Sequence, residues 1–307
     1  MACIYSMLFH RQNSPKLPAP LLESTVSLNT FSFKPRRRSL LLSAATLAGL
    51  AATTGSQVVL AQAGSGTAPA TSKRILFVVS NEVKVGPAGF PIGYWLAEIA
   101  HPFWAFQQKG FSMVVASPDG GAVMQDAMSD PEGGRFGPPQ DFLATGFKHS
   151  PRIKQVMSAT VKLSTIKESD FDAILVVGGL GPMLTFADNT ELHQLFARFY
   201  EAGKVSAALC HGTVILLKTR LANGALLAEG KQWTGFCNVE EDAVDKAFNT
   251  KVQPFRIEDE AKKIANTRFV QGPPYRPFAV RDGRLITGQQ GSSGARTAEL
   301  VIEALSA

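Results

Sequence analysis

Short apolar runs alternate with longer amphipathic segments from about residue 74 to the C-terminus. Apolar runs of β-branched residues that end in small or polar residues predict buried strands, and apolar residues at helical spacing predict helices. Strands are expected at residues 74–80, 111–118, 171–177, 205–209 and 231–236. Helices are expected at residues 94–109, 190–202, 241–248, 257–265 and 294–305.

The first predicted helix, residues 94–109, carries an acid on its apolar face. Glu98 shares that face with Trp95, Ile99 and Pro102, because residues three and four positions apart are neighbours on a helix. The acid is either a surface residue on a ragged stripe or a buried acid at a site, and the pattern leaves both open. Pro102 lacks a backbone donor and is expected to kink the helix.

Two further segments complete the expected topology. Residues 122–160 are rich in Gly, Pro and Ser and show little periodicity, which predicts an inserted cap region over the strand ends. Residues 278–288 predict a β-hairpin that turns at Asp282-Gly283. The alternation elsewhere predicts a single doubly wound, flavodoxin-like α/β domain. Its central sheet is expected to be mostly parallel, with helices on both faces and a site at the strand C-terminal ends.

The positive charge of the chain is concentrated at its front. The net charge is +6, and residues 1–63 contain six Lys and Arg residues against one acid, so the remainder is close to neutral. No basic stripe with interleaved aromatic residues remains to bind phosphates. Nucleic acid is therefore not an expected partner.

Residues 1–63 have the pattern of an export signal. Arg36, Arg37 and Arg38 precede a mildly apolar run, and Ala61-Gln62-Ala63 supplies a small-residue cleavage site. The paired arginines favour the twin-arginine type, and the alternative is an uncleaved membrane anchor, since the apolar run is nearly long enough to span. We expect a cleaved signal, export to the periplasm or medium, and no stable membrane insertion.

A Gly/Ser/Thr/Pro linker is expected at residues 64–73, ahead of the domain at residues 74–307. Cys210 and Cys237 are the cysteines of that domain. Two cysteines form no disulfide framework even in an oxidising compartment, and a bridge between them would silence a nucleophilic thiol. We expect both to be free.

Residues 205–217 hold the candidate nucleophile. A strand of small apolar residues leads into Cys210-His211-Gly212 and then into an apolar helical run. Small residues around a nucleophile avoid collisions where a strand turns sharply into a helix, as in a nucleophile elbow. The helix N-terminus and the adjacent imidazole favour the thiolate, so a depressed pKa is expected for Cys210. The alternative is a buried structural cysteine.

A glycine-rich turn, residues 178–182, follows the strand at residues 171–177. It lacks the Lys-Ser/Thr of a phosphate-binding loop and the full dinucleotide-binding spacing. Its other use is to present backbone N–H groups to a developing oxyanion. The predicted donors are the N–H groups of Gly179, Leu180 and His211.

The remaining histidines of the domain show no spacing typical of metal ligands. His101, His149 and His193 are isolated in the sequence and are read as helix or loop residues, with His101 the one that could line the pocket. We expect neither a metal nor another cofactor.

Several separate motifs occur in the order of a known family. They are Glu98–Pro102, Ala116–Gly121, Gly178–Pro182, Ala208–Gly212, Thr234–Phe236 with Glu240-Glu241, and Asp282–Gln289. In these motifs the chain resembles the ThiJ/PfpI superfamily, the class I glutamine amidotransferase-like fold. More narrowly, it resembles the branch of glutathione-independent glyoxalases (glyoxalase III, D-lactate dehydratase) and stress chaperones.

The resemblance implies roles for five residues. Cys210 matches the nucleophile, His211 the adjacent histidine, and Glu98 the helix acid that hydrogen-bonds the sulfur. Glu241 matches the acid that completes a Cys-His-Glu triad, with Glu240 as the fallback. Burial next to a thiolate would raise the pKa of Glu98 and leave it a proton donor or shuttle.

The resemblance implies that methylglyoxal-like 2-oxoaldehydes become 2-hydroxy acids through a cysteine-dependent lyase reaction. The expected partner is thus a small reactive carbonyl compound, and a homodimer is usual in the superfamily. One departure is Leu180, which stands where the family's glycine turn usually has a histidine. Two alternatives stay open. One is an amidase or peptidase, and the other is a holdase chaperone or a redox sensor whose cysteine is oxidised.

Overall fold

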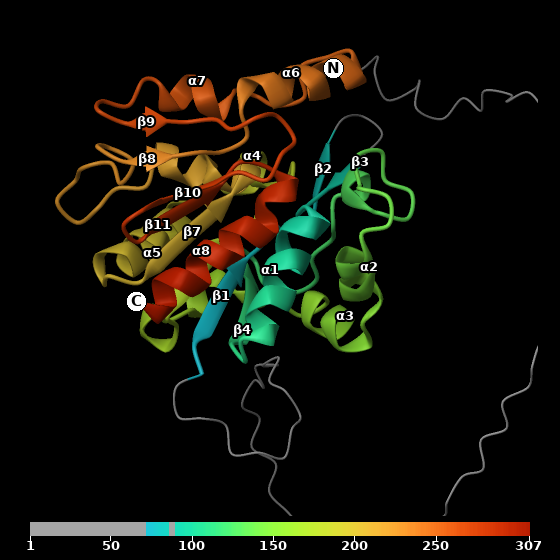
Figure 1. The fold of residues 1–307 in the computed structure, drawn as a ribbon, viewed down its shortest axis with the longest axis horizontal. Coiled ribbons are helices and arrows are strands. Elements are labelled where there is room, and N and C mark those ends of the chain that lie inside the picture. Colours follow the sequence, from blue (N-terminus) through green and yellow to red (C-terminus); the bar gives the residue numbers. More distant parts are fainter. Residues whose placement is uncertain (1–71, 86–89) are drawn as a thin grey trace, which may run out of the picture. The chain divides into compact units, whose positions relative to one another are not determined.

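The computed structural model describes residues 72–85 and 90–307, and its centre is a seven-stranded sheet (Figure 1). The strand order is β10-β11-β7-β6-β1-β4-β5. All neighbouring strands pair in parallel except the hairpin β10–β11, which is antiparallel. The strands are β1 (Arg74–Val78), β4 (Ser112–Ser117), β5 (Val161–Lys162), β6 (Ala173–Val176), β7 (Val205–Leu209), β10 (Ala279–Asp282) and β11 (Leu285–Gly288). The predicted doubly wound α/β fold is confirmed.

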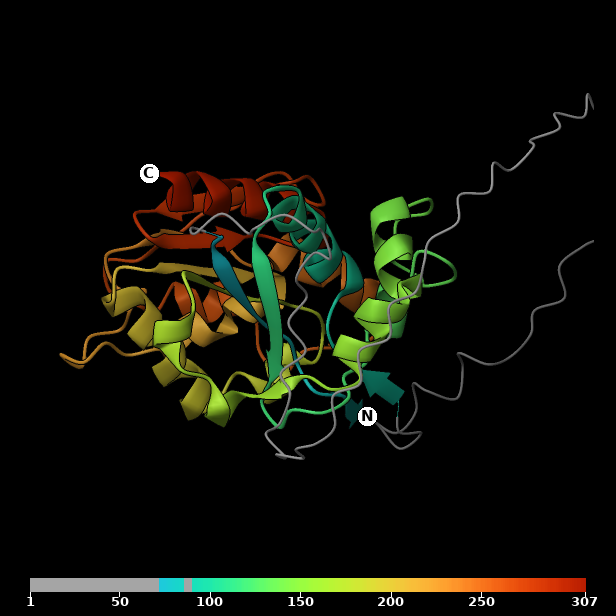
Figure 2. The same cartoon turned by 90° about the horizontal axis from the view of Figure 1, so that it is seen from below.

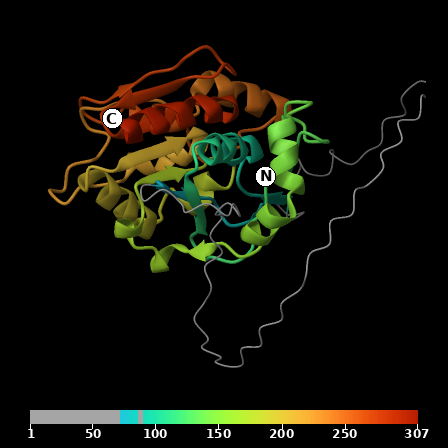
Figure 3. The same cartoon turned by 60° about the horizontal axis from the view of Figure 1, so that its bottom comes forward.

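Helices cover both faces of this sheet. The longer ones are α1 (Leu96–Gln108), α5 (Thr190–Glu201), α6 (Asn238–Phe248) and α8 (Gly294–Ser306), and the shorter ones are α2 (Phe142–His149), α3 (Pro151–Met157), α4 (Pro182–Thr185) and α7 (Ile257–Ala261). Figure 2 shows α1 and α8 on one face and α5 on the other. In Figure 3, α2 and α3 lie beside α1.

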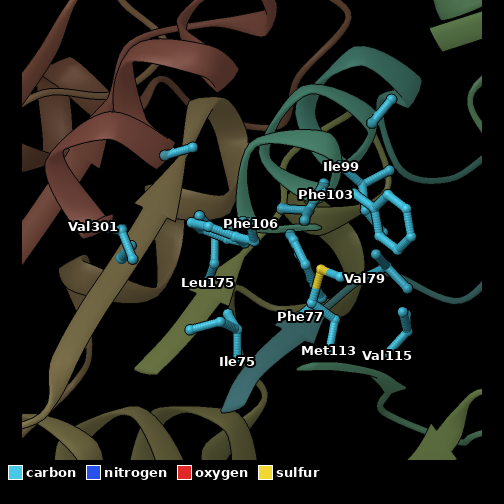
Figure 4. Packing of buried hydrophobic residues seen from close by; sticks show 14 of the residues in the cluster. Ile75, Phe77, Val79, Ile99, Phe103, Phe106, Met113, Val115, Leu175 and Val301 are labelled. Atoms are coloured by element: carbon cyan, nitrogen blue, oxygen red, sulfur yellow. The ribbon is translucent and has the colours of Figure 1, made fainter. Parts of the chain in front are cut away.

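Alternate residues of each central strand supply the two cores. In β1, Ile75 and Phe77 pack under α1 and α8, whereas Leu76 and Val78 pack towards α5. This alternation follows from the two-residue repeat of a strand, and burial on both faces explains why β1 is a continuous apolar run. Figure 4 shows the first core, in which the rings of Phe77 and Phe106 lie 5.8 Å apart.

The cap region at residues 122–160 is more regular than its composition predicts. It contains α2 and α3, and β5 follows it at the sheet edge. Asp141 caps α2 by accepting a hydrogen bond from Ala144 N, and Ser150 caps α3 with Pro151 in its first turn. These caps stabilise helices too short to show a clear apolar repeat.

Two other expectations about local structure are corrected. The predicted strand at residues 231–236 is only β8 (Gln232–Trp233), which pairs with β9 (Arg268–Phe269) outside the main sheet. A further small sheet joins β2 (Val83–Val85) to β3 (Phe90–Ile92). The helix after the elbow is a 3₁₀ helix, Cys210–Leu217. Pro102 lies inside α1, and the kink at this residue stays a prediction.

The predicted export signal, and most of the predicted linker, lie outside the described residues. Among the residues that are described, no helix is long and apolar enough to cross a membrane.

We predict that Phe106→Ala lowers the free energy of unfolding by about 4 kcal/mol, because it leaves a cavity at the centre of one core. Phe106 is fully buried, whereas Phe142 is 80% exposed and serves as the matched control. Phe142→Ala is expected to change stability by no more than about 0.5 kcal/mol. Urea unfolding of both variants measures the difference, and equal effects would contradict the assignment of the core.

Candidate active site

Cys210 stands at the end of β7 in a backbone conformation that side chains rarely adopt. Its φ is +54°, in the left-handed region, which costs a non-glycine residue about 1–3 kcal/mol. Gly212 makes the turn possible, because a Cβ there would lie 2.8 Å from the carbonyl oxygen of Val176. The thiol is thereby placed at the C-terminal ends of β6 and β7, as an elbow requires.

A chain of polar contacts leads from the sulfur into the protein. Cys210 Sγ lies 3.6 Å from His211 Nδ1, and His211 Nε2 lies 3.0 Å from Glu241 Oε1. His211 is 2% exposed and Glu241 is 1% exposed. With Nε2–H donating to the Glu241 carboxylate, Nδ1 is left as an acceptor that faces the thiol. The structure thus brings together the three residues expected to form a triad.

Glu98 approaches the same sulfur from α1 and is fully buried. Its Oε2 accepts a hydrogen bond from Gly178 N at 2.8 Å, and its carboxyl also faces the Cys210 thiol, although Oε1 makes no hydrogen bond of regular geometry. Burial raises the pKa of Glu98 to about 7, and the contacts with Cys210 and Gly178 only partly oppose it. The sequence left open whether Glu98 is a surface residue or a buried acid at a site. The structure shows the buried acid.

The expected low pKa of Cys210 is wrong for this site. Burial raises the pKa of the thiol well above its ordinary value, and the negative charge of Glu98 raises it further. The backbone N–H of His211 acts in the opposite direction but is outweighed. Because the sulfur is 3% exposed and faces a carboxyl group, the resting residue is a thiol.

The glycine turn packs tightly against this cluster. A Cβ on Gly178 would lie 2.6 Å from Glu98 Oε2, and one on Gly179, whose φ is +115°, would lie 2.6 Å from Trp95 N. Leu180 N donates to Asp126 Oδ2 at 3.2 Å. Leu180 is therefore not a free oxyanion donor, since a carboxyl group already occupies its N–H.

The other two predicted donors differ from each other. The N–H of His211 is directed to the Cys210 sulfur. No described residue accepts a hydrogen bond from the N–H of Gly179. Among the three predicted donors, Gly179 is the one left available to an oxyanion.

Asp126 is a site residue that the sequence analysis missed. It is fully buried, it accepts hydrogen bonds from Leu180 N and Met128 N, and burial raises its pKa to about 6. Its charge also adds to the rise in the pKa of Glu98. The only signal in the sequence is an acid that caps a short 3₁₀ helix, Ala127–Ser129, within a segment without periodicity.

Glu240, the alternative candidate for the third triad residue, has a structural role instead. Its Oε1 accepts hydrogen bonds from Tyr275 N at 2.8 Å and Gln289 Nε2 at 3.1 Å. Its Oε2 accepts from Cys237, so it also caps the start of α6. Cys237 and Cys210 are both free thiols.

A cavity of about 640 Å³ opens onto Cys210, His211 and Glu98. Part of its wall is the cap segment 136–141, which is tied down by the contact of His101 Nε2 with Asp141 Oδ2 at 2.8 Å. His101 therefore lines the pocket. The cap covers part of the cavity, and Cys210 is 3% exposed, which limits the access of water to the thiol.

The two other histidines lie elsewhere. His149 contacts Glu132 on the surface, and His193 contacts the carbonyl oxygen of Phe186. Within residues 72–85 and 90–307, no three His, Cys, Asp or Glu side chains form a group that could hold a metal ion.

The fold and the elbow define an α/β protein with a cysteine at a strand-to-helix corner, and comparison with known proteins identifies its family. The chain belongs to the DJ-1/PfpI family, whose model matches residues 93–304.

Similar curated proteins include glyoxalase 3 of Candida albicans, which is 28% identical over 70% of this chain and 91% of its own length. The glutathione-independent glyoxalase of Saccharomyces cerevisiae is 29% identical over 71% of this chain and 91% of its own length.

Similar solved structures include Rapid Encystment Protein of Francisella tularensis, with a TM-score of 0.68 and 26% identity, over 76% of this chain and 99% of that one. Glyoxalase III of Candida albicans follows with a TM-score of 0.61 and 26% identity, over 76% of this chain and 97% of that one.

We predict that Glu98→Gln stabilises the protein at high pH and not at low pH. Because burial raises the pKa of Glu98 from 4.5 to about 7, the folded state binds more protons than the unfolded state between these values. Glu98 therefore makes stability fall as pH rises through this window, by about 3 kcal/mol in total.

Glu98→Gln has no carboxyl group to ionise at this position, so its free energy of unfolding does not show this fall. Urea unfolding from pH 4 to pH 8 is therefore expected to show that the free energy of unfolding of Glu98→Gln increasingly exceeds that of the wild type as pH rises. Glu191→Gln, on the exposed surface of α5, is the control. An advantage that is independent of pH would contradict the buried, protonated acid.

Proposed function

We propose that this protein is a glutathione-independent glyoxalase that converts 2-oxoaldehydes of the methylglyoxal type into 2-hydroxy acids. The observation that carries the proposal is the buried chain Cys210–His211–Glu241, with Glu98 at the same sulfur and a cavity in front of it. The similar proteins named as glyoxalases support the same assignment. The reaction class is a cysteine-dependent lyase without an added cofactor.

In the first step, Cys210 attacks the aldehyde carbon of the substrate. The thiol proton passes to Nδ1 of His211, and Glu241 stabilises the imidazolium that forms. The C–S bond forms as the carbonyl π electrons move to oxygen, which gives a hemithioacetal. We expect the N–H of Gly179 to stabilise the oxyanion, an effect worth about 3 kcal/mol for a well-aligned donor.

The second step moves a proton between two carbons. A base removes the hydrogen on the former aldehyde carbon to give an enediol, and return of a proton to the neighbouring carbon gives a thioester. Glu98 and His211 both lie at the sulfur, and either can hold this proton. A carboxyl group with a pKa of about 7 exchanges protons readily near neutral pH. Water then releases the 2-hydroxy acid and regenerates the thiol, so no external oxidant is needed.

The redox-sensor alternative receives less support from this geometry. A sensor cysteine is an accessible thiolate, whereas Cys210 is 3% exposed and its pKa is raised.

We retain export through residues 1–63 as part of the proposal. Fractionation of cells that express the full chain, with Arg36 and Arg37 both replaced by Lys as the comparison, tests it.

We predict that wild-type protein forms lactate from methylglyoxal without glutathione and that Cys210→Ala reduces kcat at least about 1,000-fold, because Cys210 is the only cysteine among the described residues that line the cavity. Cys237→Ser is the control, since that buried thiol contacts Glu240 and not the pocket. Lactate is measured enzymatically. A folded wild-type protein without turnover would overturn the proposal.

We predict that Glu241→Gln lowers kcat about 100-fold or more with little loss of stability, because the imidazolium loses its counter-charge. Glu240→Gln is expected to lower the thermal midpoint, since Glu240 caps α6 and holds the loop of Tyr275, while activity per folded molecule stays near wild type. The reverse pattern would show that Glu240 completes the triad.

A further inference from the structure

The cavity is far larger than methylglyoxal requires. A three-carbon aldehyde takes the room of a few water molecules, each with a share of about 30 Å³ in the liquid. The cavity in front of Cys210 measures about 640 Å³, which falls in the range that encloses ligands of drug size. If the proposed function is right, most of the cavity is occupied by a part of the substrate that does not react.

The wall next to the thiol is apolar. Leu180 and Met128, 7% and 8% exposed, pack in one cluster with Trp95 and Phe248, and all four line the cavity. Leu180 lies within the glycine turn and lines the same cavity as Cys210. Apolar surface that a substrate covers on binding contributes favourably in proportion to its area.

The cap closes this wall on its outer side. The rings of Phe136 and Phe248 lie 6.0 Å apart, and Arg135 covers Phe248 while it donates to the carbonyl oxygen of Ala247 at 2.8 Å. Phe136 belongs to the cap and Phe248 to α6, so the two sides of the cavity meet through an aromatic contact. This contact covers part of the apolar wall, although Phe136 itself is 37% exposed.

The charged groups of the cavity leave no site for an anionic substituent. None of the described residues that line it is Lys or Arg. His101 is paired with Asp141, and His211 with Glu241. A phosphate or carboxylate on the substrate would thus be buried near the acids Glu98 and Asp141 with no Lys or Arg among the described lining residues, which is costly.

We propose, on the basis of the proposed function, that the substrates of this protein are neutral 2-oxoaldehydes with a bulky apolar substituent. The aldehyde carbon lies at Cys210, and the alkyl or aryl group packs between Leu180, Met128, Trp95 and Phe248. Methylglyoxal, which carries only a methyl group, is then turned over but is a weak substrate.

The test compares kcat/KM for methylglyoxal, 2-oxopentanal, 2-oxohexanal and phenylglyoxal without glutathione. Each added methylene group that becomes buried is expected to raise kcat/KM about fourfold. A straight-chain series separates burial from the electronic effect of an aromatic ring. A value that stays flat or falls along the series, with methylglyoxal turned over, overturns this inference and leaves the proposed function standing.

Leu180→Asn places a polar group of similar size on the wall, and it is expected to lower the ratio of kcat/KM for 2-oxohexanal over methylglyoxal about tenfold. Leu184→Asn is the matched control, because Leu184 is 48% exposed on α4 and does not line the cavity. Phe248→Ser provides a second test, from α6, if Leu180→Asn does not fold.

An unchanged ratio in folded variants of both sites contradicts the apolar binding site. If folded wild-type protein turns over none of the four aldehydes, the proposed function itself fails and this inference with it.

Discussion

The structure depends on holding Cys210 in a strained backbone conformation at the end of β7. A positive φ at this residue lifts the sulfur out of the sheet, but only if nothing occupies the space around it. Gly178 and Gly212 supply that space, since a Cβ at either position would collide with the elbow or with β6 and the residues after it. The strain of about 1–3 kcal/mol is small against the packing of two cores on the central sheet, which explains why the fold can maintain it.

The second constraint is that three acidic side chains lie near the imidazole of His211. Glu98, Asp126 and Glu241 are all buried within the electrostatic reach of His211, and burial holds the pKa values of Glu98 and Asp126 well above normal. The carboxyl groups of such a cluster take up and release protons near neutral pH. The cluster is therefore suited to moving protons between sulfur, nitrogen and substrate carbon, at a cost in stability that grows with pH.

The sequence predicts the elements that have a strong local signal. The apolar runs identify the strands around the elbow, and Glu98 stands out as an acid on an apolar helix face. The sequence pattern does not predict the helices α2 and α3 or the role of Asp126, because short capped segments have no apolar repeat. The raised pKa of Cys210 and the occupied N–H of Leu180 depend on burial and on groups distant in sequence, which no local pattern encodes. Glu241 and Glu240 are adjacent in sequence, and only the fold decides which of them faces His211.

The covalent role of Cys210 is the central claim, and rapid-quench mass spectrometry tests it most directly. Wild-type and Glu98→Gln proteins, which both keep His211 as the base for the first step, are mixed with methylglyoxal, quenched during the first turnover and digested. The account predicts an adduct on the peptide that contains Cys210 and none on the peptide that contains Cys237, because only the first thiol opens into the cavity. Lactate formation by wild-type protein without any adduct on Cys210, in either protein, would contradict it.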